Sequence, residues 1–187
     1  MEEIVVGIDV GTTKICALVG RVEEDNPIRI MGVGIEPSDG IRKGIIVDLA
    51  AATQAIARSV KKAESTSGLE ITSALVSIAG AHVASVNSRG ASAVNGKVIE
   101  QYDLNHAMEQ ARAVAIPNDR EIIHVIQRGF SVDGQDGIRS PRGMHGYRLE
   151  VEAHIITASA ATVDNLRHCV SASGVKIQEF VLNPLAS

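Results

Sequence analysis

The stretch from residue 4 to residue 19 constrains the fold of this chain more than any other. Two apolar runs, Ile4–Val10 and Ile15–Val19, flank the polar sequence Gly11-Thr12-Thr13-Lys14. The pattern predicts a β-hairpin with a tip of small and polar residues, and it places Asp9 just inside the first strand. Glycine lets the backbone approach a ligand, and backbone N–H groups, hydroxyls and an ammonium suit a polyphosphate. An ordinary hairpin with a polar turn is the alternative.

Composition narrows the class of protein. The 187 residues are 45% hydrophobic and include no Trp, two Tyr and two Phe, so the core must consist of Val, Ile, Leu and Ala, as is usual in α/β proteins. The net charge of −4 has no basic stripe, which argues against a nucleic-acid partner. Cys16 and Cys169 lie apart in apolar runs and predict reduced thiols in a cytosolic compartment. The sequence shows no signal peptide and no apolar run of about 18 residues.

The order of apolar and polar segments predicts a mixed sheet flanked by helices. Strands are expected in the hairpin and at 28–35, 75–79, 122–127, 130–133, 148–159 and 175–182. Helices are expected at 49–65, 104–115 and 163–173, with Asp48 and Asp103 as caps of the first two. Segment 134–146 is expected to be a loop. Residues beyond Gly80 become small and polar, which indicates a smaller module inserted near 82–153.

Four stretches carry a resemblance to a known family. The hairpin, Val5–Gly20, resembles the first phosphate loop of the actin-like ATPase superfamily. With the runs Gly40–Leu49, Ile123–Phe130 and His154–Ser187, it is similar to FtsA, a family of bacterial cell-division proteins in that superfamily. The resemblance implies an α/β fold with an actin-like (ribonuclease H-like) subdomain, 1A, at residues 1–81 and 154–187. A small α+β subdomain, 1C, is then inserted at residues 82–153.

The resemblance also implies a nucleotide site. Four residues at the hairpin tip are expected to bind ATP: Gly11, Thr12, Thr13 and Lys14. Asp9 is expected to hold Mg²⁺ through water, and no residue is assigned a catalytic role. In related chaperone ATPases a glutamate precedes the proline at the end of the last strand, whereas Asn183 precedes Pro184 here. An amide cannot accept a proton as a carboxylate does, so at most a slow ATPase is expected.

Partners and location follow from the same resemblance. Self-association is expected through residues 82–153, and the family helps to link the FtsZ ring to the cytoplasmic membrane at the division septum. A complete FtsA is considerably longer than this chain. The second phosphate loop, the FtsZ contact and a C-terminal membrane helix are therefore expected to be absent here. The chain is thus expected to be an amino-terminal fragment with half of a nucleotide site, cytoplasmic and peripheral on the membrane.

Other interpretations stay open. Another actin-like scaffold, such as a pilus-assembly protein, is one alternative, which the identity of its partners would distinguish. A sugar-kinase-type phosphotransferase fits less well, because segment 82–153 offers no convincing catalytic or sugar-binding residues. The six histidines lack the spacing of a zinc site, and Gly32-Val33-Gly34 lacks the third glycine of a dinucleotide loop. Lys43 is expected to face solvent. Loop 137–146, with Arg139, Arg142 and His145, reads as a solvated loop rather than a partner surface.

Overall fold

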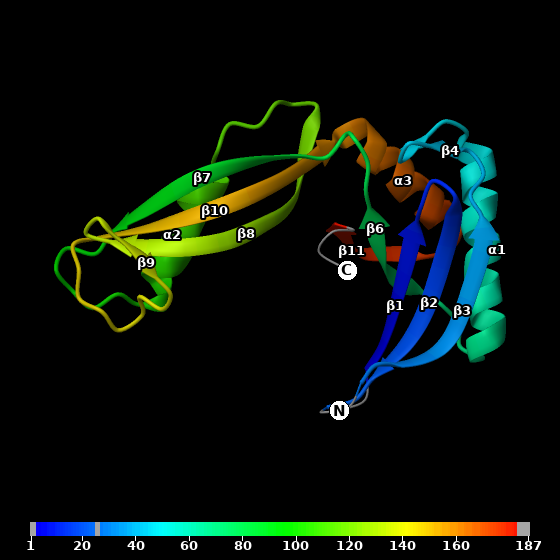
Figure 1. Ribbon diagram of the computed structural model, residues 1–187, viewed down its shortest axis with the longest axis horizontal. Helices are drawn as coiled ribbons and strands as arrows, with labels where there is room; N and C mark the ends of the chain where they lie inside the picture. The colour runs from blue at the N-terminus through cyan, green and yellow to red at the C-terminus, as the bar shows by residue number, and fades with distance from the viewer. Residues whose placement is uncertain (1–2, 25–26, 183–187) are drawn as a thin grey trace. The chain divides into compact units, whose positions relative to one another are not determined.

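The computed structural model describes residues 3–24 and 27–182, which fall into two compact units (Figure 1). The first unit comprises residues 1–83 and 159–187, and the second comprises residues 84–158. The sequence pattern places these limits near 82 and 153. Strand β10, Arg148–Ser159, runs unbroken past residue 153, and the division falls close to the end of this strand.

The first unit is built on a five-stranded mixed sheet in the order β11-β6-β1-β2-β3. Its strands are β1 Glu3–Val10, β2 Lys14–Val22, β3 Arg29–Pro37, β6 Ser73–Ile78 and β11 Lys176–Leu182. β1, β2 and β3 pair antiparallel, whereas β6 is parallel to both β1 and β11. Parallel strands need a long crossover, and helices α1 (Leu49–Ser67) and α3 (Ala160–Ala172) lead into β6 and β11 respectively. The short strands β4 Ile41–Arg42 and β5 Ile45–Ile46 pair in the loop before α1.

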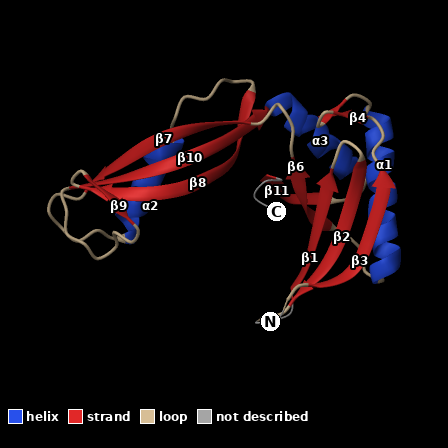
Figure 2. Cartoon of the chain, in the orientation of Figure 1, coloured by secondary structure: helices blue, strands red, loops and turns tan. Residues whose placement is uncertain are grey.

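Alternation along these strands puts the core on one face of the sheet. Ile8 and Val76 are buried, whereas their neighbours Asp9 and Ser77 are only partly buried. Helices α1 and α3 contact each other and supply the other half of this core. Figure 2 shows the two helices beside the strands of this unit. The opposite face therefore carries the polar residues of β1 and β6.

Helix α1 begins and ends where the sequence predicts caps. The Asp48 carboxylate accepts a hydrogen bond of 3.0 Å from the backbone N–H of Ala51. At the other end, Gly68 adopts a left-handed conformation with φ 72°, and its N–H donates to the carbonyl of Glu64 at 2.8 Å. These bonds satisfy backbone groups that a helix end leaves without partners.

Two glycines of β3 let α1 pack directly on the strand. A Cβ atom on Gly34 would lie 1.9 Å from the carbonyl oxygen of Ser59, and one on Gly32 would lie 2.6 Å from that of Ala63. The Ser59 hydroxyl donates to the carbonyl of Gly34 at 3.0 Å, which closes the contact. The Gly32-Val33-Gly34 sequence therefore serves helix packing.

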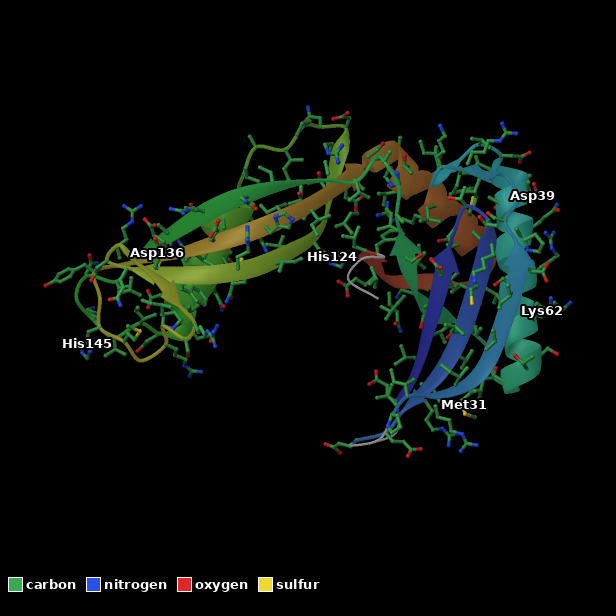
Figure 3. All side chains as sticks on the ribbon, in the orientation of Figure 1. Met31, Asp39, Lys62, His124, Asp136 and His145 are labelled. Carbon is green, nitrogen blue, oxygen red and sulfur yellow. The ribbon has the colours of Figure 1, made fainter. Side chains whose placement is uncertain are left out.

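Charged side chains also link β3 to α1. Lys62, labelled in Figure 3, donates to Glu36 Oε1 at 2.8 Å and to the carbonyl of Ile35 at 3.1 Å. Arg58 Nε lies 3.3 Å from Glu36 Oε2. The hydrogen bond from Lys62, aided by that from Arg58, lowers the pKa of Glu36 below its ordinary value. Exposed ion pairs are screened by water, so we expect the glycines to position α1 more firmly than this pair does.

The second unit has a four-stranded sheet in the order β7-β10-β8-β9 and one helix, α2 (Gln101–Arg112). Its strands are β7 Ala84–Ala93, β8 Arg120–Val132, β9 Gln135–Ile138 and β10 Arg148–Ser159. Leu149 and Val151 of β10 are buried against Ala107 and Ala111 of α2. Gly90 lets α2 pack directly on β7, as the glycines of β3 do for α1, because a Cβ atom there would lie 2.0 Å from the carbonyl oxygen of Ala107.

The structure differs from the sequence-based prediction in segment 134–146, which contains β9. Val132 pairs with Gln135 across the two residues Asp133 and Gly134, whose φ angles are 50° and 84°. Two consecutive positive φ angles define the tight turn that suits the twist of paired strands, and Asp-Gly is among its preferred sequences. The Asp-Gly pair was the sequence signal for this hairpin. The strands predicted at 122–127 and 130–133 are likewise one continuous strand, β8.

Helix α2 begins three residues before the predicted start at 104, and Asp103 is not its N-cap. The N-cap is Glu100, and the Asp103 carboxylate reaches back to accept a hydrogen bond of 2.9 Å from the N–H of Glu100. Asp103 is therefore the third helical residue of a capping box. A carboxylate near a helix start has the same preference at both positions, so the sequence alone did not distinguish them.

Candidate functional site

The hairpin tip between β1 and β2 has a tightly fixed backbone. The N–H of Gly11 donates to the carbonyl of Lys14 at 3.1 Å, and a Cβ atom on Gly11 would lie 2.7 Å from that carbonyl oxygen. The N–H of Ser38, just after β3, donates to the carbonyl of Thr13 at 3.0 Å. Two hydrogen bonds and one steric requirement therefore define the shape of the tip before any ligand is present.

The side chains at the tip are available to a ligand. Thr12, Thr13 and Lys14 are all exposed. Within residues 3–24 and 27–182, no side-chain hydrogen bond or ion pair engages their hydroxyls or the ammonium. Two exposed hydroxyls and one exposed ammonium at a glycine turn are donors that suit the oxygens of a phosphate group.

Asp9 lies on the same hairpin, on the sheet face away from α1 and α3. Its Oδ1 accepts a hydrogen bond of 2.5 Å from the hydroxyl of Ser77 on β6. Both residues line a shallow hollow of about 320 Å³ on this face, with side chains from four strands: Gly7, Ile8, Asp9, Cys16, Leu18, Leu75, Ser77 and Val181. A carboxylate that lines such a hollow, two residues from a turn with exposed donors, can order the water shell of a divalent cation.

Cys16 is the residue opposite Asp9 in the hairpin register. Burial raises the pKa of the Cys16 thiol above its ordinary value, and the negative charge of Asp9 raises it further. The ammonium of Lys14 acts in the opposite direction and lowers this pKa. The pKa of Cys16 is therefore set by burial and by the two charges of Asp9 and Lys14 on the same hairpin.

All five residues that the sequence assigned to the site lie on one hairpin, with Asp9 in β1, Gly11, Thr12 and Thr13 in the turn, and Lys14 at the start of β2. Sequence reasoning missed Ser77, which comes from a strand 68 residues further along the chain. Its only sequence signal was a hydroxyl close to the end of an otherwise apolar strand. Asn183, on which the expectation of slow hydrolysis rests, lies outside the described residues.

The other sequence candidates belong to other segments of the chain than this hairpin. Lys43 is exposed in the loop before α1, and Arg139, Arg142 and His145 are exposed in the second unit, where Figure 3 labels His145. Within the described part of the chain, no group of three His, Cys, Asp or Glu side chains could hold a metal ion. No helix among the described residues is long and apolar enough to cross a membrane.

The family model and the curated relatives point to the same family. Residues 80–157 match the family model described as "SHS2 domain inserted in FTSA". The chain is 45% identical to the cell division protein FtsA of Borreliella burgdorferi, over all of this chain and 46% of that protein. It is 37% identical to FtsA of Pseudomonas aeruginosa, over 99% of this chain and 44% of that protein. The identity to FtsA of Bacillus subtilis is 36%, over 100% of this chain and 42% of that protein. The chain thus spans less than half the length of the curated relatives it matches.

A solved structure shows the same fold at low sequence identity. The structure titled "PilM-PilN type IV pilus biogenesis complex" matches with a TM-score of 0.60 and 12% identity. The match covers 97% of this chain and 48% of that one. At this identity the likeness concerns the fold alone, which is actin-like α/β with an inserted SHS2 domain.

Proposed function

Because this chain belongs by sequence to the FtsA family of cell division proteins, we propose that it supplies the first half of an ATP site in an actin-like division protein. The observation that carries the proposal is the hairpin tip. Its glycine turn, two exposed hydroxyls and exposed ammonium stand beside a carboxylate, within a chain related to FtsA over its whole length.

The proposed binding mode uses each group for one task. The backbone N–H groups of the turn and the hydroxyls of Thr12 and Thr13 donate to phosphate oxygens, and Lys14 neutralises part of their charge. Asp9 holds Mg²⁺ through the waters that this small cation keeps in protein sites. The cation would shield the charges of adjacent phosphates. The residues present therefore fit both Mg²⁺ and ATP.

We propose that the nucleotide acts mainly as a conformational ligand. Asn183 stands before Pro184, where related chaperone ATPases carry a glutamate, and an amide is no general base. Any hydrolysis would be slow. The proposal thus describes a nucleotide-dependent structural protein rather than an enzyme with high turnover.

The partners and location proposed for the whole protein follow its family. We propose that it links FtsZ to the cytoplasmic membrane at the division site, with the FtsZ contact and the membrane helix outside this chain. The cytoplasmic side of that membrane is then its place in the cell. Sequence identities of 31–45% to FtsA proteins favour this role over a pilus-assembly role, which has only a fold likeness at 12% identity in its support.

The second unit is the proposed self-association module. On strand β10, Arg148 is exposed and Glu150, Glu152 and His154 are half-buried on one polar face. Between Arg89 and Glu152 the sequence carries eight basic and nine acidic residues. A hollow of about 300 Å³ on this unit is lined by both signs of charge, among them Arg89, Arg128, Glu150 and Glu152. Mixed charges allow two copies to approach without net repulsion and to pair polar groups.

The first test concerns Asp9 in the full-length protein. Asp9→Asn is expected to weaken Mg·ATP binding about tenfold, because the amide is a poorer partner for the metal's waters. In EDTA, binding of ATP should stay unchanged or tighten slightly, since one negative charge near the phosphates is gone. Titration calorimetry with and without Mg²⁺ measures both affinities.

The control for this test is Asp39→Asn, which removes an exposed carboxylate from the loop after β3, where Figure 3 labels it. Its affinities should match those of the wild type in both buffers. An Asp9→Asn protein that keeps the same ratio of affinities with and without Mg²⁺ would show that Asp9 has no metal role.

The second test removes the second unit. Thr157 pairs with Ala84, so the two ends of the second unit are neighbours. A short Gly-Ser linker can therefore join Val83 to Ser159. The full-length protein lacking residues 84–158 is expected to bind Mg·ATP but to lose polymerisation on vesicles, because the proposed contact surface is gone. Sedimentation with vesicles and ATP measures the assembly.

Retained nucleotide binding serves as the internal control here, since it shows that the first unit is folded. If the shortened protein assembles on vesicles as the intact one does, the second unit has no role in self-association. Its function would then have to be sought in the shielding of the nucleotide cleft.

A further inference from the structure

Ser77 lies beside Asp9 and has no assigned role in the proposed ATP site. It belongs to β6, which runs parallel to β1 with Gly7 opposite Leu75 and Ile8 opposite Val76. The next residues in this register are Asp9 and Ser77. Since Ile8 and Val76 point to the core, alternation puts Asp9 and Ser77 together on the other face.

The hydroxyl of Ser77 makes two hydrogen bonds at this point. It donates to Asp9 Oδ1 at 2.5 Å, and it accepts from the backbone N–H of Val10 at 3.1 Å. The accepted bond orients the hydroxyl, so that its single proton is directed at the carboxylate. The Ser77 side chain thereby connects β6 to the end of β1, through the backbone of Val10 and the carboxylate of Asp9.

Asp9 depends on this contact. Within the described residues, the Ser77 hydroxyl is the only hydrogen-bond partner of the Asp9 carboxylate, and Asp9 forms no ion pair there. The bond engages Oδ1, which leaves Oδ2 for water. Groups that hold a metal-ligating carboxylate in place commonly change metal affinity when they are removed.

We infer that Ser77 is a positioning residue for Mg²⁺·nucleotide, which fixes the Asp9 carboxylate so that its second oxygen meets the metal's water shell. This inference rests on the proposed ATP site. A purely structural tie between β1 and β6 is the competing role, and the two differ in whether the effect of Ser77 depends on Mg²⁺.

The test uses the full-length protein and three substitutions on one strand. Ser77→Ala removes the hydroxyl, and Ser77→Thr keeps it and adds a methyl group beside the hollow. Ser73→Ala is the matched control, because Ser73 lies on the same face of β6 and its hydroxyl contacts Gln178 at 2.9 Å instead of Asp9. Affinity for ATP is measured by calorimetry with Mg²⁺ and in EDTA.

Ser77→Ala is expected to lower the affinity for Mg·ATP about tenfold, at the low end of the range for such supporting residues, and to leave binding in EDTA unchanged. Ser77→Thr should bind within about twofold of the wild type, and Ser73→Ala should match it. In an Asp9→Asn background, Ser77→Ala should have no further effect, because two residues that act as a unit are not additive.

The outcomes distinguish a failure of the role inferred for Ser77 from a failure of the metal role proposed for Asp9. An equal loss with and without Mg²⁺, or no loss, makes Ser77 only a structural tie and overturns the inference. If Asp9→Asn itself has no Mg²⁺-specific effect, the metal role of Asp9 falls and this inference with it. If Ser77→Ala fails to fold, Ser77→Cys replaces it: its weaker donor should give a smaller loss that is again confined to Mg²⁺.

Discussion

Lys14→Ala is expected to weaken Mg·ATP binding by the full-length protein about 10- to 100-fold. A hydrogen bond that involves a charged group contributes about 1.5–3 kcal/mol, and each 1.4 kcal/mol corresponds to a tenfold change in affinity. The Lys14 ammonium is exposed and, in the described part of the chain, forms no ion pair that would compete with a phosphate. Calorimetric or fluorescence titration with Mg·ATP measures the effect.

Lys43→Ala provides the matched control for charge. Lys43 is exposed in the loop before α1, so its removal changes the net charge equally without removing a group of the hairpin tip. The affinity of this variant should stay within about twofold of the wild type, because Lys43 makes none of the proposed phosphate contacts and salt screens exposed charges. Equal losses in the two variants would reduce the role of Lys14 to general electrostatic attraction, and the proposed phosphate contact would be wrong.

Gly34→Ala is expected to destabilise this chain by about 3 kcal/mol, the upper end of the usual range for overpacking and a large share of the roughly 5–15 kcal/mol typical of a folded domain. The added Cβ would lie 1.9 Å from the carbonyl oxygen of Ser59, and no rotation of a side chain can relieve a clash with backbone. Helix α1 would have to move off β3 and give up the bond from Ser59 to Gly34. Urea unfolding followed by circular dichroism gives the free energy.

Gly7→Ala is the control for this substitution. Gly7 lies in β1 of the same sheet, and a Cβ atom there meets no atom within 4 Å. The same change in composition and backbone entropy should therefore cost little or nothing. A Gly34→Ala protein as stable as the Gly7→Ala protein would mean that α1 and β3 do not pack as closely as described.

The parts of the fold that the sequence predicted well are those with local causes. The hairpin follows from alternating apolar residues on either side of a polar turn. Helix α1 follows from its apolar face, its cap at Asp48 and its stop at Gly68, which lie within one element. The hairpin into β9 also had a local signal, the Asp133-Gly134 pair, but the many glycines around it suggested a loop instead.

Only the part of the candidate site that is contiguous in sequence could be predicted from local patterns. Asp9 and the turn beyond it are contiguous in sequence, so their proximity could be predicted. The partner of Asp9, Ser77, depends on the parallel register of β1 and β6, which forms only after a helix and a crossover have been placed. The close contact between Gly34 and Ser59 is equally non-local. A pair of glycines in a strand indicates close approach, but it does not identify the helix that approaches.

The environment of Cys16 has a consequence for the chemistry of the hairpin. Thiols react with oxidants and electrophiles as thiolates, and burial and the charge of Asp9 both keep this thiol protonated by raising its pKa. The sulfur atom therefore behaves as a small apolar group at the edge of the hollow. Because a protonated thiol is a weaker nucleophile than a thiolate, the carboxylate proposed to hold Mg²⁺ also lowers the reactivity that we expect of its neighbour toward peroxide.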